Sequence, residues 1–140
     1  MIYHRHAKCS IQLNESLKAV ILKLEGFISM EEYQLFHETA LKLLSEKGFY
    51  HWIGDFKNAE IISLDNRIWM KTCFFPMAQK ARLREMAVIL AQSHITNWTL
   101  KTMIKESHAD IPVNYFSQMD EVIGWFNKTA VPCPAQESLD

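Results

Sequence analysis

The sequence predicts an α/β fold in which helices cover a mixed, mostly parallel five-stranded sheet. Short apolar segments of strand length alternate with segments of helical periodicity, and this alternation is typical of parallel strands joined by helices. The first two strand-like segments, 2–13 and 17–26, are separated only by turn residues at 14–16, which predicts an antiparallel hairpin. The predicted order is therefore strand, strand, helix, strand, helix, strand, helix, strand, helix.

The first helix has signals at both ends. Ser29 precedes it and Glu32 follows three residues later, a capping box in which each side chain satisfies a backbone N–H at the helix start. Gly48 ends the helix, where a left-handed residue is needed. The apolar residues between them share one stripe: Met30, Tyr33, Phe36, Ala40, Leu43 and Leu44. The third strand, 49–56, follows directly, which predicts a right-handed crossover and parallel pairing with 17–25.

The rest of the chain continues the alternation of helices and strands. The remaining predicted elements are a helix at 63–82, a strand at 84–91, a helix at 96–109, a strand at 111–116 and a helix at 117–128. No internal repeat and no linker interrupts them, so we expect a single domain at 1–128. The last residues, 129–140, contain two prolines and little periodicity, which predicts a flexible tail.

Composition and charge argue against several classes of function. Fifteen Lys and Arg residues balance sixteen Asp and Glu residues to a net charge of −1, which offers no general attraction for nucleic acid or an anionic membrane. No apolar run approaches the ~20 residues of a membrane-spanning helix, and the N-terminus lacks the apolar core of a signal peptide. Three cysteines without a CxxC pair argue against a disulfide framework and a thiolate zinc site. We therefore expect a cytoplasmic protein without metal or other cofactor.

Residue patterns typical of catalysis are missing from the sequence. It has no HExxH, GxSxG, GxGxxG or P-loop motif. His4 and His6 share a strand face and could reach a metal together, but no third ligand is evident. His51 is expected to be a hydrogen-bonded core residue. Cys73 falls on a helix stripe and is expected to be a buried, inert thiol. We expect no enzymatic activity.

A series of residues runs in a fixed order through the predicted elements, and a family resemblance rests on it. These residues are Asp55 at the end of the third strand, Trp69, Phe75, Pro76 and Ala78 in the second helix, the strand segment MAVIL, and then Tyr115, Phe116, Glu121 and Trp125. Together with the order of elements, they resemble the STAS domain, the fold of anti-sigma-factor antagonists (SpoIIAA-like proteins) and of sulfate-transporter tails. The match is closest to a branch of small stand-alone STAS-like proteins, and it covers about residues 17–127.

This resemblance implies a regulatory domain without catalysis that acts by binding a partner protein. In the anti-sigma-factor antagonists, a Ser or Thr in a D.SG segment begins the helix after the third strand, and its phosphorylation abolishes binding. The corresponding segment here, ISLDNRI (62–68), has no Ser-Gly pair, and Ser63 is its only hydroxyl residue. Ser63 could hold a phosphate at the helix start, but Glu60 and Asp65 would repel it. The residues favour a helix cap instead, with Asn66 three positions later.

Pro76 lies within the second predicted helix, where it removes one N–H and crowds the carbonyl of Thr72. The resulting bend either wraps the helix around the sheet or opens a groove beside Phe74 and Phe75. Adjacent phenylalanines on one helix cannot both face the sheet, so we expect one to be partly exposed at a protein interface. The predicted partner-binding residues are Lys57, Asn58, Asp65, Trp69, Phe74, Phe75 and Pro76, and the simplest partner is a second copy of the chain. On this interpretation, Phe75→Glu weakens self-association while the fold survives.

The seven methionines and sixteen aromatic residues allow an alternative function. Their default role is core packing, since methionine fills irregular gaps. They could also line a pliable pocket that carries a small apolar, lipid-like ligand. The fold also resembles the CRAL-TRIO lipid-carrier domain, which supports this alternative. It predicts a cavity bounded by Trp69, Trp98 and Met103.

Overall fold

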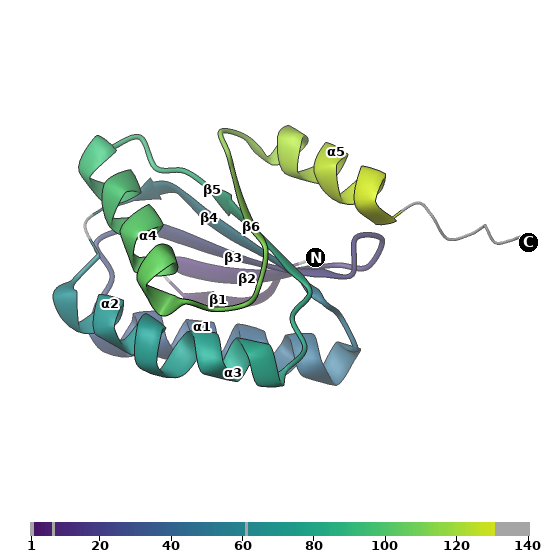
Figure 1. Ribbon diagram of the computed structural model, residues 1–140, viewed down its shortest axis with the longest axis horizontal. Helices are drawn as coiled ribbons and strands as arrows, with labels where there is room; N and C mark the ends of the chain where they lie inside the picture. Colours follow the sequence, from purple (N-terminus) through teal and green to yellow (C-terminus); the bar gives the residue numbers. More distant parts are fainter. Residues whose placement is uncertain (1, 7, 61, 131–140) are drawn as a thin grey trace, which may run out of the picture.

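The computed structural model describes the backbone at residues 2–6, 8–60 and 62–130, and the side chains at 8–60 and 62–127. One sheet with helices on both faces makes up this part of the chain (Figure 1). Its elements are β1 (Ile2–His6), β2 (Cys9–Asn14), β3 (Ala19–Gly26), α1 (Met30–Lys47), β4 (His51–Ala59), α2 (Leu64–Trp69), the π-helical turn η1 (Met70–Phe74), α3 (Phe75–Lys80), β5 (Glu85–Ile89), α4 (His94–Ser107), β6 (Val113–Phe116) and α5 (Met119–Ala130).

The sheet has six strands in the order β1-β2-β3-β4-β5-β6. The first three are antiparallel neighbours, and β3 to β6 are parallel, which confirms the mixed, mostly parallel α/β fold. The segment 2–13, predicted as one strand, forms two strands that pair as a hairpin, so the sheet has one strand more than expected. The sequence gives little sign of this turn because the residues between His6 and Cys9 include no Gly, Pro, Asn or Asp.

The predicted boundaries of α1 are confirmed. The Ser29 hydroxyl accepts a hydrogen bond from the Glu32 N–H at 3.2 Å. Gly48 adopts a left-handed conformation with φ 69°, and its N–H donates to the Ser45 carbonyl. The helix therefore stops at the point where the chain must turn back into β4.

The helices form two layers of unequal size around the sheet. α1, α2, η1, α3 and α4 cover one face and enclose the larger core, whereas α5 covers the other (Figure 1). Consecutive residues of β4 show the division, since Trp52 belongs to the larger core and Ile53 to the core beneath α5. In that smaller core, Val122 and Phe126 of α5 are fully buried against strand residues.

The helix predicted at 63–82 contains a π-helical turn directly before Pro76. Within it, the Phe75 N–H donates to the Met70 carbonyl, five residues back. Such a turn holds one residue more than an α-helical turn. The helix thus reaches the proline with a wider turn instead of continuing as a regular α-helix.

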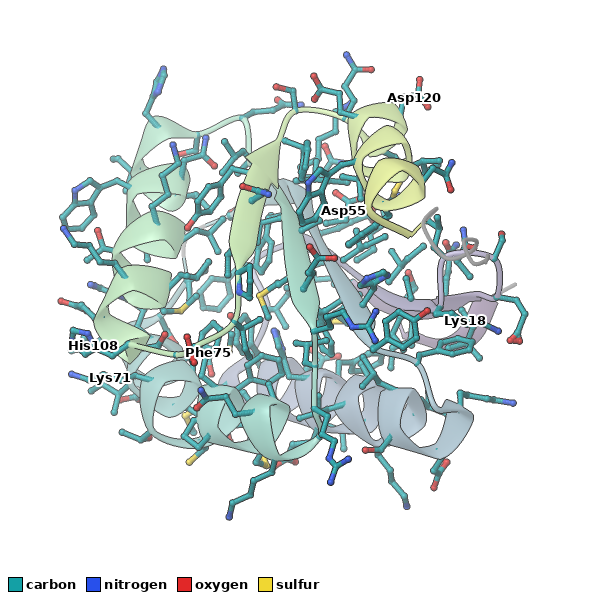
Figure 2. All side chains as sticks on the ribbon, turned by 45° about the vertical axis from the view of Figure 1, so that its right-hand side comes forward. Lys18, Asp55, Lys71, Phe75, His108 and Asp120 are labelled. Atoms are coloured by element: carbon teal, nitrogen blue, oxygen red, sulfur yellow. The ribbon has the colours of Figure 1, made fainter. Side chains whose placement is uncertain are left out.

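The expectation that Phe74 or Phe75 is partly exposed is wrong. The two side chains are 0% and 1% exposed, and Phe75 lies between its helix and the sheet (Figure 2). α1 and α4 contact this helix from two sides, so two adjacent side chains can both be covered. The Phe74 ring centre is 5.1 Å from that of Trp52 in β4 and 5.4 Å from that of Phe75. Cys73, predicted to be buried, is exposed on the outer side of the π-helical turn.

Some expectations lie at the limits of the described residues. α5 continues to Ala130, and residues 131–140 of the predicted tail lie outside the described part, as do the side chains of His4 and His6. No helix within the described ranges has the length and apolar character that crossing a membrane requires.

Candidate protein-binding site

Three helices begin at one edge of the sheet, where the parallel strands β3, β4 and β5 end (left in Figure 1). A serine side chain caps each of them: Ser29 for α1, Ser63 for α2 and Ser93 for α4. Binding sites of open α/β sheets are commonly found at this edge. Ser63 accepts the Asn66 N–H at 3.2 Å, so it acts as the helix cap that the residues favour. Its phosphorylation remains a prediction of the resemblance.

Four large apolar side chains are exposed on α2 and α4 next to this edge. They are Leu64, Ile68, Ile95 and Trp98, and we call them the α2–α4 surface. Leu64 and Trp98 are 64% and 62% exposed, although such side chains usually contribute to a core. Exposed apolar side chains on two elements that touch, as α2 and α4 do through Arg67 and Trp98, are typical of protein interfaces.

Arg67 connects the two helices of the α2–α4 surface. Its guanidinium carbon lies 6.0 Å from the centre of the Trp98 ring, within the range of a cation–π contact. The Arg67 Nε is buried and has no hydrogen-bond partner, and no described carboxylate forms an ion pair with this side chain. A carboxylate brought by a partner could accept from this guanidinium.

The structure places the predicted partner-binding residues in different environments. Lys57, Asn58, Asp65 and Pro76 are exposed, Trp69 is half-buried, and Phe74 and Phe75 belong to the interior. Sequence reasoning missed Leu64, Arg67, Ile68 and Ile95. Their signal was spacing: Leu64 and Ile68 lie four residues apart, and the buried side chains of α2 and η1 fall on another side of the helix.

The cavity between the sheet and the helices does not fit a lipid-like ligand. It has a volume of about 20 Å³, room for about one water molecule, whereas sites for small organic ligands measure roughly 300 Å³ or more. Met103 lines it, but Trp69 and Trp98 do not, and Trp98 points to solvent. The predicted pocket bounded by Trp69, Trp98 and Met103 is therefore wrong.

His37 forms part of the wall of this cavity and is fully buried. Its Nδ1 lies 2.7 Å from the Tyr33 carbonyl oxygen, so Nδ1 carries the proton and donates it. Burial lowers the pKa of His37 to about 4, although the bond to the carbonyl opposes this shift. His37 is neutral at pH 7, and its ring packs 4.3 Å from that of Tyr33. It is a core residue.

His51 is also a hydrogen-bonded core residue, as predicted, and its ring faces α5. Its Nδ1 lies 2.8 Å from the Leu17 carbonyl oxygen and its Nε2 lies 3.2 Å from Oε1 of Glu85. The ring stacks on Phe126 at 4.2 Å. Both ring nitrogens therefore have partners in neighbouring segments of the chain, at Leu17 and at Glu85. Among the described residues, no group of three or more His, Cys, Asp and Glu side chains could hold a metal ion.

A smaller cavity lies between the ends of β3 and β4 and the helices α1 and α2. Its volume is about 10 Å³, and Tyr33 and Asn66 both line it. The Tyr33 hydroxyl and the Asn66 Oδ1 are buried without a protein hydrogen-bond partner. A single water molecule could accept from the hydroxyl and donate to the amide oxygen.

We expect Tyr33→Phe to lower the free energy of unfolding by about 1 kcal/mol, because it removes one hydrogen bond to that water. Urea denaturation of both proteins measures the difference. Glu46→Ala, at an exposed position of the same helix, is the control and should change stability little. A gain in stability for Tyr33→Phe would show instead that the hydroxyl is buried without a partner.

Comparison with known proteins bears on the fold. Among solved structures, an uncharacterized protein of the DUF3478 family with a SpoIIAA-like fold, from Shewanella loihica PV-4, matches with a TM-score of 0.56. The match covers 90% of this chain and 99% of that protein at 14% sequence identity. No protein-family model and no curated protein sequence matches. The resemblance to SpoIIAA-like proteins is thus confirmed at the level of the fold: this chain is an α/β domain with SpoIIAA-like architecture.

Proposed function

We propose that this chain is a non-catalytic regulatory domain of the cytoplasm that acts by binding a protein partner through the α2–α4 surface. The observation that carries the proposal is the exposure of four large apolar side chains on α2 and α4, one of which, Trp98, makes a cation–π contact with Arg67. Tryptophan and arginine are the residues most often found where binding energy concentrates in interfaces.

The fold and the interior of the domain support this function. The STAS resemblance implies a regulatory domain that binds a partner protein, and the SpoIIAA-like architecture agrees with that resemblance. The buried histidines bond to backbone carbonyls, His37 to Tyr33 and His51 to Leu17. Such bonds give both histidines a structural role and do not require catalysis.

Trp98→Ala and Leu64→Glu should each weaken association of the domain at least tenfold, because both remove apolar contact and the second also introduces a charge. Native mass spectrometry of gently purified protein, with sedimentation over a concentration series, measures the assembly. Both side chains are more than half exposed, so circular dichroism should show an unchanged fold.

The matched control is Ile123→Glu, which changes an exposed apolar side chain of α5 on the opposite face of the sheet. It should leave the assembly unchanged. If Trp98→Ala and Leu64→Glu leave every complex of the protein as stable as before, the α2–α4 surface is not the binding site and the proposal is wrong.

A further inference from the structure

We infer that the partner of the α2–α4 surface is a second copy of the chain, which docks the outer face of its α1 there in a two-fold symmetric dimer. This inference rests on the proposed function and deepens it. Charge and exposed apolar side chains on the two faces support the pairing: one is apolar and basic, and the other is apolar and acidic.

The basic side belongs to α2, η1 and α4. Arg67 and Lys71 lie on the first two elements and Lys105 on α4, whereas Lys101 of α4 lies over the Tyr115 ring of β6. The acidic side chains of these three elements are Asp65 and Glu106. Arg67 has no ion pair with any described side chain, and its guanidinium contacts only the ring of Trp98 among the cation–π contacts, so its charge is open to a carboxylate of a partner. A carboxylate held beside Leu64 and Ile68 could pair with the guanidinium.

The acidic side is the outer face of α1. Glu31, Leu35 and Glu38 lie at positions i, i+4 and i+7, which places them on one side of the helix, and all three are exposed. Leu35 is 54% exposed between the two carboxylates. Residues 30–41 contain three glutamates and no Lys or Arg, and the first basic residue on this stripe is the exposed Lys42, at its C-terminal end. This face therefore offers both an apolar side chain and the carboxylates that the α2–α4 surface lacks.

The arrangement of the helices allows a closed pair. α1 and α2 contact each other within one chain, and the rings of Tyr33 and Trp69 meet edge to face at 6.5 Å. A two-fold axis along this boundary would place α1 of each copy on the α2–α4 surface of the other. The same contact is then made twice, and no surface remains to extend the assembly, as in most symmetric dimers.

Charge reversal on each face tests this inference. One variant carries Glu31→Lys and Glu38→Lys, and the other carries Lys71→Glu and Lys105→Glu. Alone, each should self-associate at least tenfold more weakly than the wild type, because like charges then meet across both contacts. Mixed in equal amounts, the two should form a heterodimer with near wild-type affinity, since both contacts again join opposite charges. Native mass spectrometry with one variant isotope-labelled detects the heterodimer.

Controls come from the β2–β3 turn, at the other end of the molecule from Lys71 (Lys18 in Figure 2). Glu15→Lys and Lys18→Glu reverse the same charges on exposed side chains and should leave the dimer unchanged. The wild-type protein is also measured over a concentration series that ends at about 1 mM. If it is still monomeric at that concentration, where even a weak dimer would form, the inference is overturned. A mixture that forms no heterodimer also overturns it.

The two proposals can fail separately. If Trp98→Ala dissociates the dimer but charge reversal on α1 does not, the α2–α4 surface binds another part of the second copy, so only the further inference is wrong. If neither change affects the assembly, the proposed function fails with it. Restoration of the dimer by mixing supports both.

Discussion

A Phe75→Glu variant is expected to be unfolded under conditions in which the wild-type protein is folded. The phenylalanine ring is 1% exposed, and losing it costs about 3–5 kcal/mol. A carboxylate in its place lies in an apolar interior, which adds several kcal/mol unless it takes up a proton. The sum approaches the whole stability of about 5–15 kcal/mol typical of a domain. Circular dichroism with a urea titration measures the outcome.

Two controls separate burial from other effects at this position. Phe75→Leu keeps an apolar side chain and should fold with a loss of about 1–2 kcal/mol. Cys73→Glu introduces the same charge two residues away on an exposed position and should fold normally. A stable, folded Phe75→Glu protein would mean that the side chain faces solvent or a partner, as the sequence alone suggested.

The stability of the domain is expected to fall as the pH decreases from 6.5 to 4, in part because of His37. Burial lowers the folded-state pKa of His37 to about 4, against 6.5 in the unfolded chain. The unfolded state therefore binds a proton in this interval that the folded state does not. Stability is complete above pH 6.5 and is lost toward pH 4, by roughly 3 kcal/mol from this group.

His37→Phe is the matched variant because it keeps a planar ring in the same aromatic cluster but cannot titrate. Its unfolding free energy, measured by urea titration at several pH values, should decline less steeply between pH 6.5 and 4 than that of the wild type. All other side chains are the same in the two proteins, so the difference between the slopes reports on His37. Identical slopes for the two proteins would contradict the assignment of a neutral, buried His37.

Local chemistry explains which parts of the fold could be predicted. Ser29, Glu32 and Gly48 mark the ends of α1 through hydrogen bonds and backbone angles that involve only nearby residues, and the structure confirms them. The parallel pairing of β3 and β4 could also be predicted, because one helix joins the two strands and such crossovers are almost always right-handed.

The errors arise where distant segments decide the environment of a side chain. A helix packed against one sheet has one buried face, and Phe74 and Phe75 cannot share it. α4 follows later in the chain and covers another side of the same helix, so both are buried. The position of α4 also leaves Trp98 outside, although its spacing resembles that of core residues. For the candidate site, only the region around Asp65 and Trp69 could be predicted, and not the exposed side chains that form the α2–α4 surface.

The π-helical turn at Met70–Phe74 also affects how this chain is compared with its relatives. It holds one residue more than the equivalent stretch of α-helix, so residues before and after it are offset by one position relative to an uninterrupted helix. An alignment that allows no insertion here would match either the segment around Leu64 and Ile68 or the segment around Pro76 and Ala78, but not both. A homologue that lacks the π-helical turn is therefore expected to have one residue fewer between Trp69 and Phe75.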